Sequence, residues 1–214
     1  MSKKILVAVL PVVSLLWGNL VIADDDHGSK ECPVGLVSGK TLDDEFGPGS
    51  QDATRCLDKR KKVKIVMQVN KFCRDAVPNP QCARPYALGN IVNMIKDYEI
   101  THGMRRGKDY EIVAVVHSGG GALVLKNEGF NGAGMAVAGR NQHQGLVETL
   151  MSQGVKFYFC QNTTRGMMKK GALPSSAVTT GGATAEMIDG VQYVTAGVSA
   201  IGDFQSRGYK YVQP

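Results

Sequence analysis

Cys160 stands where its thiol could act as a nucleophile. It ends the apolar stretch VKFYFC (155–160), and the residues after it, QNTTRGMMKK, can start a helix. The free N–H groups at a helix N-terminus and the cation of Arg165 would both favour the thiolate, which is the reactive form. The alternative is that Cys160 is packed and inert, as free cysteines commonly are.

His117 and the glycines after it form a second candidate group. They end the stretch YEIVAVVHSGGG (110–121). His117 could orient or protonate a group bound at Cys160, or be an ordinary hydrogen-bonded loop histidine. Gly119 and Gly120 could let backbone amides hold an anion, or simply allow a tight turn. The spacing matches neither the dinucleotide fingerprint nor the Walker phosphate loop.

Metal and cofactor signals are absent from the sequence. It contains no C-x-x-C pair, no H-x-x-x-H pair, and four scattered histidines. Structural zinc sites need such clustered ligands, and attached c-type haem needs C-x-x-C-H. We therefore expect no metal and no cofactor.

From residue 61 onward, short β-branched runs alternate with stretches of helical spacing. The strands are expected over KVKIVMQV (62–69), YEIVAVV (110–116), VKFYFC (155–160), VQYVTAG (191–197) and YKYVQ (209–213). The helices between them are expected within 83–103, 143–154 and 198–208. This alternation predicts right-handed crossovers and an α/β fold with a mainly parallel sheet covered on both faces. The long connections 126–142 and 167–190 are typical of a lid, an interface or disorder.

The parallel sheet places several candidates at one edge. Ligands bind along the edge formed by the carboxyl ends of such strands. Cys73 follows the first strand, His117 and its glycines the second, Cys160 ends the third, and Gly197 follows the fourth. We expect these four segments to converge.

The N-terminus has the layout of a secretory signal peptide over residues 1–23. Lys3 and Lys4 precede a long apolar run, and Val21-Ile22-Ala23 provides the small residue at the cleavage point. The alternative is an uncleaved membrane anchor, because the run approaches the length of a bilayer span. Cleavage after Ala23 predicts export to the periplasm, with no stable membrane insertion of the mature protein.

The rest of the chain divides into a polar extension and one domain. Residues 24–60 are rich in Asp, Gly and Ser without a sustained period, whereas 61–214 has the size of an ordinary domain. The net charge is +6, and the loss of Lys3 and Lys4 with the signal leaves +4. The basic cluster DKRKKVK (58–64) lacks interleaved aromatics, so we expect a solvated segment and no nucleic-acid partner.

An exported chain with five cysteines has one left over, or one that pairs between chains. One scheme joins Cys32 to Cys56 and Cys73 to Cys82, each bridge contributing roughly 2 to 4 kcal/mol, and leaves Cys160 free. The rival scheme makes Cys73 and Cys160 a redox couple at the shared sheet edge. The residue spacing is compatible with both.

Several blocks of the sequence resemble a known family. They are KIVMQV (64–69), EIVAVVHSGG (111–120), LMSQGVKFYFCQNTTRGM (150–167) and VQYVTAGVSAIGDFQSRGYKYVQP (191–214). In this order they resemble the DsrE/DsrF-like sulfur-relay proteins, especially their exported single-domain members. The resemblance covers about residues 61 to 214.

The resemblance implies a three-layer α/β/α sandwich around a five-stranded parallel sheet, assembled into homotrimers or hexamers. In sulfur-relay members the cysteine matching Cys160 carries a persulfide and passes sulfane sulfur to a partner protein. His117 matches a histidine that many members have after the second strand. This chain departs from the pattern in its signal peptide, its four additional cysteines and its two long connections.

The sequence is therefore compatible with two functions. In the first, Cys160 accepts sulfane sulfur from a donor, and the persulfide rests against the amides of Gln161, Asn162 and Thr163, with Arg165 neutralising charge and His117 managing the proton. In the second, the chain is a non-catalytic subunit whose pocket binds a small ligand or whose loops bind a partner. A redox role for Cys73 with Cys160 ranks third.

Overall fold

The computed structural model describes residues 40, 44, 47–48, 61–73, 85–175 and 182–214. The expected signal peptide and nearly all of the polar extension lie outside the described residues. So do Cys32, Cys56 and Cys82. None of the described helices has the length and apolarity that crossing a bilayer requires.

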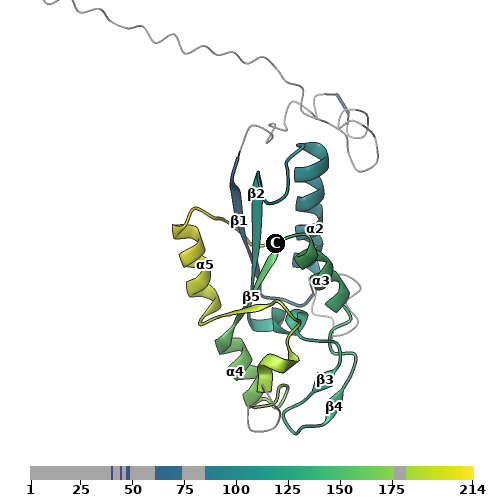
Figure 1. Ribbon diagram of the computed structural model, residues 1–214, viewed down its shortest axis with the longest axis vertical. Coiled ribbons are helices and arrows are strands. Elements are labelled where there is room, and N and C mark those ends of the chain that lie inside the picture. The colour runs from purple at the N-terminus through teal and green to yellow at the C-terminus, as the bar shows by residue number, and fades with distance from the viewer. Residues whose placement is uncertain (1–39, 41–43, 45–46, 49–60, 74–84, 176–181) are drawn as a thin grey trace, which may run out of the picture. The chain divides into compact units, whose positions relative to one another are not determined.

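The described residues form a five-stranded, all-parallel sheet, which confirms the predicted fold class (Figure 1). The strands run in the order β6-β5-β2-β1-β7. Val63 pairs with Tyr110 and Val69 with Val116, so the two central strands are in register over their whole length. Their bounds are β1 Val63–Val69, β2 Tyr110–Val116, β5 Lys156–Cys160, β6 Gln192–Val194 and β7 Lys210–Val212.

Helices cover both faces of this sheet (Figure 1). One face carries α2 (Tyr86–Lys96), which continues as the π-helix η1 (Asp97–Thr101), together with α3 (Gln144–Ser152). The opposite face carries α5 (Gly197–Ser206), which packs on Val66, Val113 and Val115 through Ile201 and Phe204. The central strands are therefore buried on both faces, as their continuous β-branched runs predict.

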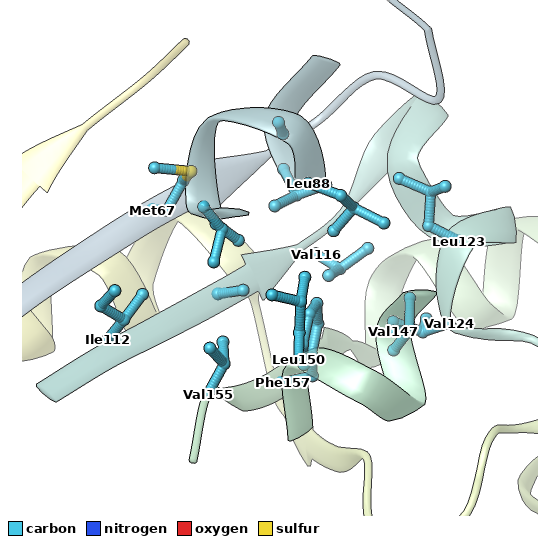
Figure 2. Close-up of a cluster of buried hydrophobic side chains, with 14 of the residues drawn as sticks. Met67, Leu88, Ile112, Val116, Leu123, Val124, Val147, Leu150, Val155 and Phe157 are labelled. Atoms are coloured by element: carbon cyan, nitrogen blue, oxygen red, sulfur yellow. The ribbon is translucent and has the colours of Figure 1, made fainter. Parts of the chain in front are cut away.

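The larger core lies under α2 and α3. Side chains from β1, β2, β5 and both helices meet there, including Met67, Leu88, Ile112, Leu150 and Phe157 (Figure 2). In α2 the residues at helical spacing, Leu88, Ile91 and Ile95, are all buried. Pro85 precedes the helix in an extended conformation, where its missing N–H costs nothing.

The long connection after β2 is ordered by a buried ion pair. It contains the 3-10 helix η2 (Ser118–Val124) and a short antiparallel pair, β3 (Gly129–Phe130) with β4 (Ala136–Val137). Arg140 Nη2 lies 2.6 Å from Glu186 Oε2, and Glu186 belongs to the second connection, in η3 (Gly182–Glu186). This ion pair thus links the two long connections. Residues 176–181 of the second connection lie outside the described part.

Candidate functional site

A pocket of about 450 Å³ lies where the carboxyl ends of β2, β5 and β6 meet. The predicted convergence holds for His117, Cys160 and Gly197, whereas Cys73 does not line this pocket. The pocket is lined by His117, Ser118, Cys160, Asn162, Thr163, Ala196, Gly197 and Val198. None of these residues is a lysine or an arginine.

Cys160 lies at the start of two helices. It is the residue directly before α4 (Gln161–Lys169), with an extended backbone that carries β5 into the helix without a linker. Its Sγ also accepts a hydrogen bond from the N–H of Gly197, the first residue of α5, at 3.2 Å. The N–H and hydroxyl of Thr163 and the N–H of Asn162 also act on this thiol and lower its pKa.

These donors favour the thiolate of Cys160. Burial raises the pKa of the thiol, since the side chain is 5% exposed, but the hydrogen bonds from Thr163, Gly197 and Asn162 outweigh it. The pKa of Cys160 is therefore lowered from its ordinary value. The positive ends of the α4 and α5 dipoles act in the same direction.

Gly197 can approach Cys160 because it has no side chain. A Cβ at this position would lie 2.9 Å from the Cβ and 3.0 Å from the Cγ of His117. The sequence predicts Gly197 at the ligand edge but indicates no role for it. The signal that could have found it is a glycine directly between a strand and a helix, a position where backbone approaches a ligand closely.

His117 lines the pocket as a buried residue with partners on both ring nitrogens. Its Nε2 lies 2.6 Å from Nε2 of Gln68, and its Nδ1 lies 2.9 Å from Oγ of Ser118. Oε1 of Gln68 in turn accepts a hydrogen bond from the hydroxyl of Tyr211 on β7. Burial lowers the pKa of His117, which favours the neutral imidazole.

Ser118 is a pocket residue that the sequence analysis missed. Its backbone has φ +51°, in the left-handed region that non-glycine residues rarely occupy. Its N–H donates to Oγ1 of Thr163 at 2.8 Å, which ties the end of β2 to the first turn of α4. The residue pattern HSGGG does not predict the positive φ of Ser118, because this backbone angle depends on how the segment packs in the folded protein.

Arg165, expected near the sulfur, is not among the residues that line the pocket. Its guanidinium donates to Oδ1 of Asn162 at 2.8 Å and lies 3.5 Å from Oε1 of Gln161. Arg165 and Gln161 line a separate pocket with Thr164, Met168 and Tyr193. The groups that lower the pKa of Cys160 are backbone amides and the hydroxyl of Thr163, and this cation is not among them.

Gly119 and Gly120 do not line the pocket, so the structure matches the tight-turn alternative for them. They lie in η2 against the end of β1, and a Cβ on Gly120 would lie 2.3 Å from the carbonyl oxygen of Val69. The glycines therefore allow the chain to turn closely past a neighbouring strand. The residues that do hold Sγ come from the starts of α4 and α5.

The redox pairing of Cys73 with Cys160 is absent from the structure. Among the described cysteines, Cys160 is free and Cys73 is disulfide-bonded. Cys73 is therefore bonded to a residue other than Cys160. The predicted bridges of Cys32, Cys56 and Cys82 involve cysteines outside the described residues.

No group of three or more His, Cys, Asp or Glu side chains that could hold a metal ion occurs within the described ranges. In the pocket itself, the possible ligands are His117 and Cys160. Nε2 and Nδ1 of His117 both have hydrogen-bond partners within the protein. The pocket offers a thiol with a lowered pKa and the hydrogen-bond donors around it.

The lowered pKa of Cys160 predicts the pH dependence of its alkylation. We expect the labelling rate of the native protein by a small alkylating reagent to rise with a midpoint below that of the urea-unfolded chain, because only the thiolate reacts. By linkage, the hydrogen bonds to the thiolate stabilise the fold above the unfolded pKa, and this stabilisation is lost as the pH falls through the folded pKa. Mass spectrometry of the Cys160 peptide measures the rate, and a native midpoint equal to or above the unfolded one would contradict the prediction.

The structural comparison includes a distant likeness, whereas the comparisons with family models and curated proteins find none. No family model matches the chain, and no curated protein matches it. Among solved structures, it is similar to the protein of unknown function MTH1491 from Methanobacterium thermoautotrophicum, at 21% identity and a TM-score of 0.46. The match covers 72% of this chain and 99% of that chain. A likeness this distant adds nothing to the functional argument.

Proposed function

We propose that this protein carries sulfane sulfur as a persulfide on Cys160. The observation that carries the proposal is the convergence of N–H groups from the starts of α4 and α5 on one free thiol. Such donors stabilise an anionic sulfur and lower the pKa of Cys160, as a nucleophile requires. The pocket beside Sγ has room for a small donor.

The loading step is a displacement at sulfur. The thiolate of Cys160 attacks a sulfane sulfur atom of a hydropolysulfide, a new S–S bond forms, and the S–S bond inside the donor breaks. With hydrogen disulfide as donor, Cys–S⁻ and HSSH become Cys–S–SH and HS⁻, so the expelled hydrosulfide takes the electron pair. In the unloading step an acceptor thiolate attacks the outer sulfur, and Cys160 leaves again as thiolate.

The resemblance to DsrE/DsrF-like proteins supports the same function. On this proposal the chain is exported to the periplasm, assembles as a homotrimer or hexamer, and meets a donor and an acceptor of sulfane sulfur there. Thiols oxidise easily in that compartment, so a reductant or a protecting partner is part of the proposal.

Intact-mass measurement tests the function directly. After incubation with hydropolysulfide and removal of the excess, the native protein is expected to gain the mass of one sulfur atom. The gain should disappear on reduction with dithiothreitol and be absent in Cys160→Ser. Thr149→Ser, an exposed change on α3, is the control and should load like the unchanged protein. A native protein that gains no sulfur would remove the proposal.

A second candidate function is non-catalytic binding of a small ligand in the same pocket. The observation that favours it is the 5% exposure of Cys160, which limits access to Sγ. In this alternative the thiol of Cys160 only lines the pocket and does not react. Slow alkylation at every pH, together with no sulfur adduct, would favour binding over transfer.

A further inference from the structure

We propose that the hydroxyl of Ser118 binds the outer sulfur of the Cys160 persulfide, and that His117 acts as a positioning residue that directs this hydroxyl. This inference rests on the proposed function and deepens it. It moves the contact with the transferred sulfur from the histidine, where the sequence analysis placed it, to the serine beside it.

The hydrogen bonds around His117 determine its tautomer. The Nε2 of Gln68 is an amide nitrogen, which can only donate, and it lies 2.6 Å from Nε2 of His117. The hydroxyl of Tyr211 contacts Oε1 of Gln68 and Oε1 of Gln213, and its single proton, given to Gln68, holds the amide in this orientation. Nε2 of His117 is therefore the acceptor, and the neutral ring carries its proton on Nδ1.

The tautomer then decides the direction of the Ser118 hydroxyl. With its proton on Nδ1, His117 donates to Oγ of Ser118 across 2.9 Å. Oγ of Ser118 consequently accepts this hydrogen bond, and its own hydroxyl proton is not donated to His117. In the described part of the chain, Oγ of Ser118 has no hydrogen-bond partner besides this ring. Ser118 lines the pocket, so its proton is available to a bound ligand.

The backbone of Ser118 is tied to the residues that act on Cys160. Its N–H donates to Oγ1 of Thr163, whose N–H and hydroxyl lower the pKa of Cys160, and Ser118 lines the same pocket as the thiol. Ser118 holds this place at φ +51°, which is sterically costly for a residue with a Cβ. Backbone strain of this kind persists where the surrounding structure enforces it, and it concentrates at functional sites.

The loaded pocket needs another donor. The hydrosulfide expelled in loading takes the proton of Cys–S–SH, which gives H2S and Cys–S–S⁻. The bound persulfide then carries its negative charge on the outer sulfur, whereas the N–H groups of Gly197, Thr163 and Asn162 act on the inner one. No cationic side chain lines the pocket. A hydroxyl directed into the pocket supplies a charge-assisted hydrogen bond to the outer sulfur.

The test is the equilibrium constant for loading. Native protein and variants are equilibrated in mixtures of sulfide and hydropolysulfide of known ratio, and the loaded fraction is read by intact mass. Ser118→Ala and Ser118→Gly are both expected to load, but with an equilibrium constant lower by about tenfold, the value of one hydrogen bond to a charged group. Ser206→Ala, an exposed serine of α5, should load normally.

The two variants of Ser118 distinguish the effect of losing the hydroxyl from the effect of relieving the positive φ. Glycine relieves the positive φ, so Ser118→Gly should melt no lower than the unchanged protein while losing as much loading as Ser118→Ala. Equal loading of Ser118→Ala and native protein would overturn the inference while leaving the proposed function intact. Normal loading of Ser118→Gly would also overturn it. A native protein that does not load at all would remove the proposed function and this inference with it.

A spectroscopic measurement tests the positioning role of His117. Proton–nitrogen NMR correlation of the imidazole, assigned with a His117→Asn variant, should show the proton on Nδ1 at neutral pH. Asparagine places an N–H near the former Nδ1, so His117→Asn should keep more loading than His117→Leu. A proton on Nε2 would overturn the inference, because the hydroxyl of Ser118 would then point at the ring.

Discussion

Replacing Glu186 by glutamine is expected to lower the free energy of unfolding by about 3–5 kcal/mol, the range for breaking a buried ion pair. Glu186 is 4% and Arg140 14% exposed by side chain, and their closest N···O distance is 2.6 Å. Oε2 of Glu186 also accepts the N–H of Phe130 at 2.8 Å. Glutamine keeps the shape but leaves the guanidinium of Arg140 buried without a counter-charge. Urea unfolding followed by circular dichroism measures the change.

A matched control distinguishes the effect of breaking a buried ion pair from the effect of removing any carboxylate charge. Glu128→Gln removes the same charge from an exposed residue of the same connection and should change stability by less than about 0.5 kcal/mol. In a double-mutant cycle, Arg140→Met combined with Glu186→Gln should cost much less than the sum of the single changes. A loss below about 1 kcal/mol for Glu186→Gln would mean that the pair does not hold the two connections together.

Replacing Gly197 by alanine is expected to disable the site while leaving the fold in place. The new Cβ would lie 2.9–3.0 Å from three atoms of His117, so either the imidazole or the start of α5 must move. Movement of the helix start withdraws the N–H that lies 3.2 Å from Sγ of Cys160. We expect the midpoint of Cys160 alkylation to shift to higher pH, sulfur loading to fall at least tenfold, and stability to drop by about 1–3 kcal/mol.

The same helix offers a matched control for this change. Gly202 lies in α5 with no atom within 4 Å of the position of an added Cβ. Gly202→Ala should therefore leave alkylation and loading unchanged and raise stability by about 0.4–1 kcal/mol. If Gly197→Ala loads and alkylates like Gly202→Ala, the N–H of α5 contributes nothing to the thiolate, and the site rests on α4 alone.

The parts of this site that could be predicted from sequence are the local ones. Cys160 and the first turn of α4 are neighbours in the chain, so the apolar run VKFYFC followed by QNTT was enough to predict N–H groups beside the sulfur. The direction of a long, exposed side chain is not determined by spacing. Arg165 is on the predicted helix, yet its guanidinium contacts Asn162 and Gln161, and Arg165 does not line the pocket.

The contacts that the sequence could not predict join residues far apart in the chain. Gly197 is separated from Cys160 by 37 positions, and Gln68 from His117 by 49. The rule that ligands bind at the carboxyl edge predicted which segments meet, but not which atoms. The tautomer of His117 and the left-handed backbone of Ser118 depend on those atoms.

The sequence alone determined the parallel α/β sheet, the buried faces of its strands and helices, and the position of a thiol at a helix start. These follow from hydrophobic periodicity and from contacts within a few residues, which the order of residues states directly. Only the tertiary structure decided that a second helix start reaches the same sulfur, that a serine faces the pocket, and that the glycines serve a turn. Those outcomes depend on close approach between separate segments, where a shift of less than 1 Å makes or breaks a hydrogen bond.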